Sequence, residues 1–262
     1  MKIYRTELRF ALVATLLAVA CALAAAQAAQ AGSGGLPSLS GEEIMRMVDK
    51  NSVVTTMTYT GTMSIDLGDR VLEKSMQVMA DGAGKSLVEF TNAEDRGVRY
   101  LKVDKDLWMY FPVEQETVRI SGHLLKEGMM GSDVSYEDAL ESGALADKYT
   151  ITVLGSETLE GRPAYVLDMK AKVKTVNYDR QKYWVDAERF VVLKAEMYAK
   201  SGRLLKESRS LSVRKFGTRW FATEVRMEDK LKKGGGTVFT MNDVLFDVKL
   251  PDDTFSLRAL GR

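Results

Sequence analysis

The sequence has 262 residues, of which 45% are hydrophobic and 28% are charged, so it has enough apolar residues for a substantial folded core. Its 37 lysines and arginines balance 36 aspartates and glutamates, and this balance argues against a protein whose net charge attracts nucleic acid or an anionic surface. The length permits one large all-β domain or two smaller domains.

The first 31 residues have the pattern of a secretory signal peptide. Lys2, Arg5 and Arg9 form a basic segment, the apolar run 10–20 follows, and small residues with A-x-A cleavage patterns end it. The run is too short and wrongly flanked for a membrane span, and no later segment approaches the length of one. We therefore expect residues 1–31 to be a signal that directs export to the periplasm.

Cys21, the only cysteine, lies within this signal and has two interpretations. The run 17–21 resembles a loose bacterial lipobox, in which Cys21 would be acylated and would anchor the protein to a membrane. Ala18 is a poor substitute for the leucine of that motif, and the residues after Cys21 stay apolar, which favours simple cleavage. In either case the mature domain has no disulfide, so packing must stabilise it.

A helix is predicted directly after the leader. Ser40 and Glu43 have the spacing of a capping box, in which each side chain bonds the backbone N–H of the other residue. Ile44, Met47 and Val48 then form a helical apolar stripe. We expect a short helix that ends near residue 51 and lies with this stripe on a sheet.

Short strands follow the helix. Residues 58–67 alternate between apolar and polar side chains, which is typical of a strand with one apolar face. Further strands are predicted at 71–80, 85–91, 98–103, 107–111 and 117–120. Their spacing is typical of an antiparallel sandwich or barrel.

The strand pattern breaks over residues 121–147, where glycines separate helix-like fragments. Ser135 and Asp138 resemble a second, weaker capping box. An interruption of this length in a β domain is either a functional lid or plug, or a disordered loop. Four apolar residues favour the lid: Leu124, Leu125, Met129 and Met130.

Strand signals resume at 148–154 and 164–172, and a three-strand meander is predicted over 178–211. In its first strand Tyr183 and Val185 share a face, and in its second strand Leu193 and Met197 do so. The last strands are predicted at 211–215, 218–231 and 237–246. With no linker and no exact repeat, we expect one domain at 40–262, preceded by a flexible Gly/Ser/Pro leader at 32–39.

Residue patterns for catalysis are scarce, so we expect no enzyme, no cofactor and no metal. His123 is the only histidine, and a Ser-His-Asp mechanism would depend on it alone. No His/Cys spacing suits zinc. The sequence has 14 methionines, which either fill an ordinary core or form a surface that adapts to varied apolar ligands.

Three blocks of the sequence together resemble the outer-membrane lipoprotein-sorting proteins, the LolA-like periplasmic lipoprotein carriers. The first block comprises residues 106–112, 118–120 and 130–138. The second comprises 183–186, 192–194 and 202–206, and the third 243–246 and 250–255. They span most of the chain after Gly41.

The resemblance implies a mainly β fold: a single strongly curved antiparallel sheet, or incomplete β-barrel, with a short N-terminal helix and the helical lid inserted around 121–147. It also implies a carrier that binds acyl chains of lipids or lipoproteins in an apolar cavity for transport to the outer membrane. Its partners would be an inner-membrane export complex and an outer-membrane acceptor. We expect a monomer that binds no nucleic acid.

The cavity is predicted from the strand faces in this fold. Its expected lining residues are Tyr59, Met63, Ile65, Trp108, Tyr110, Tyr183, Val185, Leu193 and Met197. The choice of face is open at one strand, where Leu107, Met109 and Phe111 could point inward in place of Trp108 and Tyr110. Two alternatives to the carrier are an envelope protein-interaction or sensor module with the same fold, and a membrane-tethered lipoprotein acceptor.

Overall fold

A computed structural model describes residues 36–82, 84–141 and 145–261. The expected signal peptide at 1–31, Cys21 included, lies outside the described residues. The chain divides into two units, Met1–Ser38 and Leu39–Arg262. Residues 36–38 of the first unit have no regular secondary structure, and the helices and strands below belong to the second unit.

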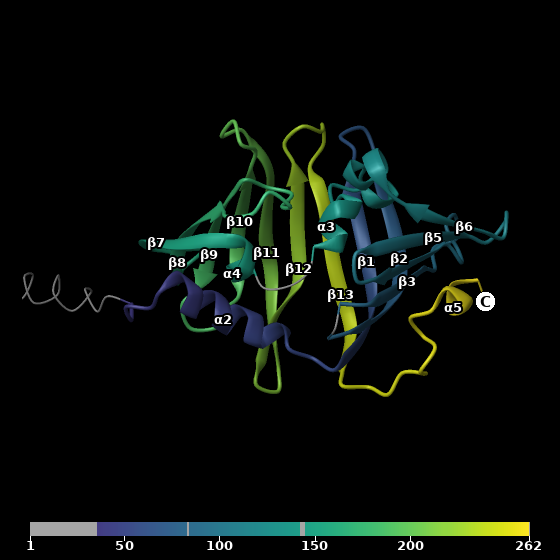
Figure 1. The fold of residues 1–262 in the computed structure, drawn as a ribbon, viewed down its shortest axis with the longest axis horizontal. Coiled ribbons are helices and arrows are strands. Elements are labelled where there is room, and N and C mark those ends of the chain that lie inside the picture. Colours follow the sequence, from purple (N-terminus) through teal and green to yellow (C-terminus); the bar gives the residue numbers. More distant parts are fainter. Residues whose placement is uncertain (1–35, 83, 142–144, 262) are drawn as a thin grey trace, which may run out of the picture. The chain divides into compact units, whose positions relative to one another are not determined.

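One antiparallel sheet of thirteen strands makes up most of the second unit (Figure 1). Its first half contains β1 (Thr56–Asp66), β2 (Val71–Asp81), β3 (Ser86–Phe90), β4 (Arg99–Val103), β5 (Asp106–Phe111) and β6 (Glu116–Ile120). Its second half contains β7 (Tyr149–Leu159), β8 (Arg162–Ala171), β9 (Arg180–Asp186), β10 (Val192–Tyr198), β11 (Leu204–Phe216), β12 (Arg219–Asp229) and β13 (Gly236–Phe246).

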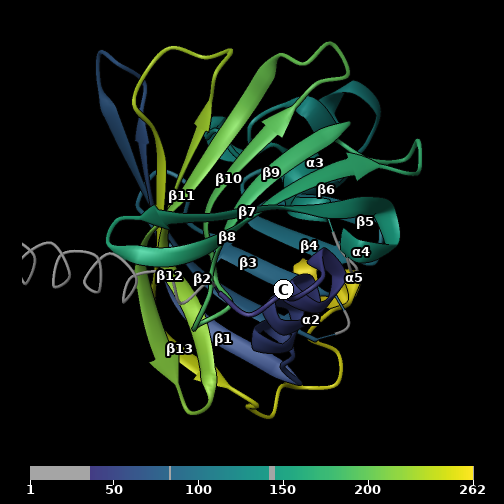
Figure 2. The same ribbon diagram turned by 90° about the vertical axis from the view of Figure 1, so that its left-hand side faces the viewer.

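The strand order explains where the predicted interruption lies. The order is β6-β5-β4-β3-β2-β1-β13-β12-β11-β10-β9-β8-β7, so β1 and β13 join the two halves and β6 and β7 form the edges. The segment between β6 and β7 therefore connects one edge of the sheet to the other. The sheet is strongly curved and not closed (Figure 2), which confirms the predicted incomplete barrel.

Short helices accompany the sheet. They are α2 (Gly41–Ser52), the 3-10 helices η1 (Gly122–Lys126) and η2 (Met129–Gly131), α3 (Tyr136–Leu140), α4 (Leu145–Lys148) and α5 (Leu257–Leu260). The predicted lid contains η1, η2, α3 and α4, and we call its part at residues 121–141 the plug. Helix α3 begins with the predicted capping box, since Ser135 and Asp138 each accept a hydrogen bond from the other's backbone N–H.

Helix α2 begins at the predicted capping box of Ser40 and Glu43 and bridges distant strands. At its start, a Cβ on Gly41 would lie 2.4 Å from Cγ2 of Ile151 in β7, so only glycine permits this approach. At its end, the Asn51 side chain donates to the carbonyl oxygens of Arg189 (2.9 Å) and Phe190 (3.0 Å). It also accepts a bond of 3.1 Å from the Trp220 backbone N–H. Three bonds from one side chain thus fix α2 to the β9–β10 turn and to β12.

Strand alternation gives the sheet two distinct faces. We call one of them the concave face, and it contains Met63, Tyr183 and Lys206. The pairing of successive strands from β2 to β9 places these three side chains on the same side of the sheet. On the opposite face, α5 packs against β3, β4 and β5 through Leu260, which is fully buried with Leu87 and Leu101. The plug and α2 both lie on the concave face. The plug covers strands of the first half of the sheet, and α2 lies against strands of the second half.

Candidate functional site

The plug covers the concave face of the first half of the sheet. Its apolar residues Leu125, Met129, Met130, Tyr136 and Leu140 pack against a buried cluster. This cluster consists of Met63, Ile65, Met76, Val78, Phe90, Tyr100, Leu107 and Ile120. The plug therefore takes the place that a bound apolar group would occupy on these strands.

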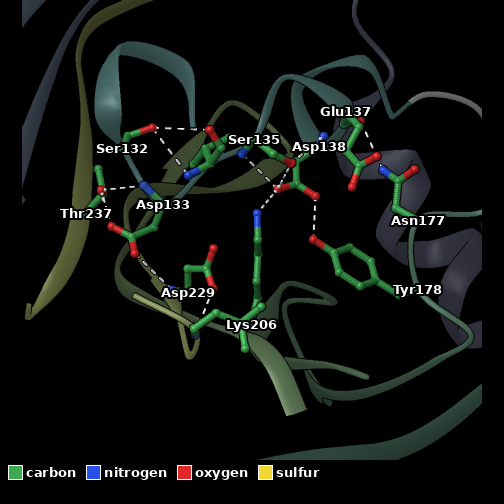
Figure 3. A network of polar contacts seen from close by, with 12 residues as sticks. Ser132, Asp133, Ser135, Glu137, Asp138, Asn177, Tyr178, Lys206, Asp229 and Thr237 are labelled. Atoms are coloured by element: carbon green, nitrogen blue, oxygen red, sulfur yellow. Dashed lines mark hydrogen bonds and ion pairs between the residues drawn. The ribbon is translucent and has the colours of Figure 1, made fainter. Parts of the chain in front are cut away.

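Polar contacts fix the position of the plug on the sheet, in addition to the packing of its apolar side chains. The Asp138 carboxylate of α3 pairs with the Lys206 ammonium of β11 at 2.5 Å and accepts a bond of 2.6 Å from the Tyr178 hydroxyl (Figure 3). Burial by itself raises the pKa of Asp138, but Lys206 and the bonds from Tyr178 and Ser135 outweigh burial and hold this pKa below its usual value. Asp138 thus completes the capping box of α3 and also anchors this helix on the sheet.

A second anchor lies in the turn between η2 and α3 of the plug. The buried Asp133 accepts bonds from the Thr237 hydroxyl (2.7 Å) and the Asp229 backbone N–H (3.0 Å), as Figure 3 shows. The Lys232 ammonium donates to the backbone carbonyl of Ser132. The two anchors together join the plug to β11, β12, β13 and the loop that follows β12. All of these belong to the second half of the sheet.

A hydroxyl pair lies within the apolar contact of the plug. The Tyr100 and Tyr136 hydroxyl oxygens are 3.1 Å apart, and Tyr100 lies 3.2 Å from the Met130 sulfur. Burial raises the pKa of Tyr100, so its hydroxyl stays protonated and can serve as a donor. This pair satisfies polar groups at a buried contact that is otherwise apolar.

An apolar cavity of about 340 Å³ opens on the concave face of the second half of the sheet. Its volume is at the lower end of the range of roughly 300–1,000 Å³ for small-molecule sites. Val48 of α2 forms one wall, and side chains of β9 to β12 and the β9–β10 turn form the rest. The lining is Val48, Asn51, Tyr183, Phe190, Val191, Val192, Ala195, Ser208, Ser210, Trp220, Phe221, Ala222 and Val225.

The cavity and the plug meet through one apolar cluster. Ala195 lines the cavity and is buried together with Met197 and Tyr178, and Tyr178 holds Asp138 of the plug. Tyr183, another lining residue, packs against the same cluster. A group that enters the cavity and extends along the concave face would therefore reach the plug.

The predicted cavity residues divide among several places. Tyr59, Met63 and Ile65 lie beneath the plug, Tyr183 lines the cavity, and Met197 packs beside it. Val185 is fully buried and pairs with Tyr165 and Val192. Of the predicted lid residues, Leu125, Met129 and Met130 pack against the sheet, whereas Leu124 is 40% exposed.

Three of the predicted cavity residues lie on the opposite face. Trp108 and Tyr110 pack with Leu260 and Phe255, because Met109 faces the plug and adjacent residues of a strand point to opposite sides. Leu193 packs with Trp184 and Val166. A register shift between Val192 and Lys194 places it there, since such a bulge reverses the alternation on which the prediction relied.

The sequence did not identify the cavity walls in β11 and β12. Ser208, Ser210, Trp220, Phe221, Ala222 and Val225 line the cavity, but two register shifts between these strands disrupt the alternation that would have assigned their faces. The pair Trp220-Phe221 at the start of a strand was the available signal. His123 is exposed in η1 and contacts no part of the cavity.

Within the described ranges, no group of three or more His, Cys, Asp or Glu side chains could hold a metal ion. In the same residues, no helix has the length and apolar character needed to cross a membrane. The described site consists of an apolar cavity and a plug held by charged contacts.

A family model with the description "Uncharacterized protein" matches residues 82–262. No curated protein matches the chain.

Three solved structures are similar over most of the chain. A DUF1329 family protein from Desulfovibrio piger is 29% identical, with a TM-score of 0.78 over 84% of this chain and 97% of its own. An outer membrane lipoprotein-sorting protein domain from Vibrio parahaemolyticus is 25% identical, with a TM-score of 0.75 over 85% and 98%. A LolA superfamily protein from Nitrosomonas europaea is 26% identical, with a TM-score of 0.69 over 85% and 100%.

Proposed function

We propose that this chain is a periplasmic carrier of acyl chains. It belongs to the family whose model matches residues 82–262, and it is similar over most of its length to an outer membrane lipoprotein-sorting protein domain and to a LolA superfamily protein. The cargo is a lipid or the acylated end of a lipoprotein, taken up on the concave face for transport to the outer membrane. The observation that carries the proposal is the apolar cavity beside α2, which lies on the same concave face of the sheet as the plug and is joined to it through one apolar cluster.

Burial of acyl chain drives the proposed binding. Each methylene that leaves water contributes about 0.8 kcal/mol, so roughly ten of them supply about 8 kcal/mol. That free energy corresponds to micromolar affinity, before the loss of translational freedom is subtracted. Since no directional contact is needed, the cavity would accept chains of different length.

Release requires a second state, and the plug supplies the element that differs between the two states. With the plug seated, Met129, Met130 and Leu140 occupy the apolar strands of the first half of the sheet. With the plug displaced, those strands are free for the far end of a longer chain. The ion pair of Asp138 and Lys206 sets the balance between the two states, because it forms only when α3 lies on β11.

Native mass spectrometry of the mature protein purified from envelope extract tests the proposal. We expect bound lipid or acylated protein, and we expect Ser208→Phe, which fills the cavity, to reduce the bound fraction at least fivefold. The matched control is Ser64→Phe, a serine in mid-strand on the opposite face of β1. Thermal unfolding of both variants verifies that they fold. Absence of any bound acyl chain from the unmodified protein would contradict the carrier function.

A further inference from the structure

A larger and more polar pocket of about 600 Å³ adjoins the apolar cavity. The two adjoin at three shared lining residues, Asn51, Phe190 and Trp220, and we call the smaller pocket the apolar end and the larger one the polar end. The polar end lies between the last turn of α2, the β9–β10 turn and the start of β12. Its lining is Met47, Lys50, Asn51, Val53, Glu188, Arg189, Phe190, Thr218, Arg219 and Trp220.

Positive charge dominates the polar end. Lys50, Arg189 and Arg219 line it, against the single acidic residue Glu188. Glu188 is already paired with Arg162 at 2.7 Å, and Arg219 is paired with Asp247 at 3.4 Å.

The two remaining cations are not compensated. In the part of the chain that the structure describes, neither Lys50 nor Arg189 forms an ion pair. Each therefore has its full charge available for an anionic group in the pocket.

The protein holds one of these cations in a fixed place. The Arg189 guanidinium lies over the Trp220 ring, 4.7 Å from its centroid, and both residues line the pocket. The backbone of Arg189 and that of Phe190 are both held by Asn51.

The residue next to Arg189 also supports a binding role. Phe190 has a φ of 51°, a left-handed conformation that is unfavourable for a bulky side chain. Strained backbone that its surroundings hold in place is concentrated at ligand sites. Here the strain places the Phe190 ring at the boundary between the apolar cavity and the cationic pocket.

We propose that this site takes an anionic amphiphile. Its acyl chain enters the apolar cavity, and its phosphate or carboxylate group lies in the polar pocket against Arg189 and Lys50. The inference rests on the proposed carrier function and specifies the ligand class. The headgroup contact also sets the direction of binding, with the chain pointing from α2 toward the plug.

Two lysophospholipids with the same acyl chain test the inference, each titrated below its micelle concentration by calorimetry. We expect anionic lysophosphatidylglycerol to bind at least tenfold more tightly than zwitterionic lysophosphatidylcholine, with a preference that declines as salt is added. In the double variant Lys50→Gln/Arg189→Gln the preference should fall below threefold, because affinity for the anionic lipid falls more than affinity for the zwitterionic lipid. Arg189→Lys should retain most of the preference. The control is Arg226→Gln, an exposed arginine on the opposite face of β12.

The possible outcomes separate this inference from the carrier function. Equal affinity of the unmodified protein for both lipids overturns the headgroup site and leaves the carrier function intact. Failure to bind either lipid overturns both. A preference that persists in the double variant places the anion elsewhere and overturns the assignment of Arg189 and Lys50. Inorganic phosphate alone is the last probe. If it binds as tightly as the anionic lipid, the acyl chain adds no affinity, and the proposal that the ligand is an amphiphile is overturned.

Discussion

Lys206 and Asp138 form an ion pair of 2.5 Å between the sheet and the plug, with side chains that are only 9% and 12% exposed. Such a pair contributes little net stability compared with apolar residues of the same size, because both charges are desolvated. Loss of one partner, however, leaves the other charged and buried. The pair is therefore suited to fixing the position of α3, and its removal should act mainly on the plug.

Lys206→Met should loosen the plug and lower stability. The variant leaves Asp138 buried without its cation, and removal of one partner from a buried pair costs about 3–5 kcal/mol. For a domain of this size, this corresponds to a fall in Tm on the order of 6–20 °C. Hydrogen exchange should accelerate in residues 121–141 more than in β1 or β2, which locates the effect.

Loss of both charges should reverse much of this effect. In Lys206→Met/Asp138→Asn no buried charge remains, and the asparagine can still accept bonds from Ser135 and Tyr178. We expect the double variant to recover more than half of the loss in Tm seen in Lys206→Met. If the loss of stability in the double variant exceeds the sum of the losses in Lys206→Met and Asp138→Asn, the two residues do not act as a pair.

Acid should release the plug through Asp138. The pKa of Asp138 is lower in the folded protein than the ordinary value of an aspartate, so ionisation of this carboxyl favours folding. This contribution is complete above the unfolded pKa of about 3.9 and is lost as the pH falls through the lower folded value. Urea unfolding at pH 6 and at successive steps below pH 4 should show a steeper loss of stability in the unmodified protein than in Asp138→Asn. Parallel pH curves for the two proteins would contradict the assignment.

The order of the elements could be predicted because its signals are local. Each capping box depends on two side chains three residues apart, and both helix starts, Ser40 and Ser135, are where the sequence placed them. Alternation over 58–67 likewise depends only on neighbours and predicted β1. The fold class also required the family resemblance, since alternation alone does not distinguish a sandwich from an open, curved sheet.

The site could be predicted only in part because faces depend on register. Met63 and Ile65 were assigned correctly to the concave face, where the alternation of β1 is unbroken at that point. Leu193 was assigned to the wrong face, because the residues around the bulge in β10 give no sign of it in the sequence. The cavity itself arises where α2, β9 and β12 meet, and these segments are far apart in the sequence.

The two faces of β5 should respond differently to substitution. Met109→Ala removes a side chain beneath the plug, so we expect faster hydrogen exchange across residues 121–141. Leu260→Ala acts on the opposite face, where a fully buried leucine packs on β3 and β4, and should lower stability by about 2–5 kcal/mol. In Leu260→Ala the hydrogen exchange of residues 121–141, measured relative to global unfolding, should be unchanged. Equal effects of the two variants on the plug would contradict the separation of the faces.

Substitution of Asn51 should lower stability and affinity more than a substitution at an exposed helix end usually does. In Asn51→Ala the Trp220 N–H loses its partner and the carbonyls of Arg189 and Phe190 lose their donor, at a cost of about 1–3 kcal/mol. The effect on binding should be larger than this fall in stability suggests, because both pockets share Asn51 and two of the three residues it holds, Phe190 and Trp220. We expect affinity for an anionic lysolipid to fall at least fivefold, with Tm lower by roughly 2–12 °C. Asn242→Ala, on an exposed position of β13, is the matched control and should change neither quantity. If Asn51→Ala lowers Tm but leaves affinity unchanged, the position of Arg189 over Trp220 does not depend on α2, and the helix serves stability alone.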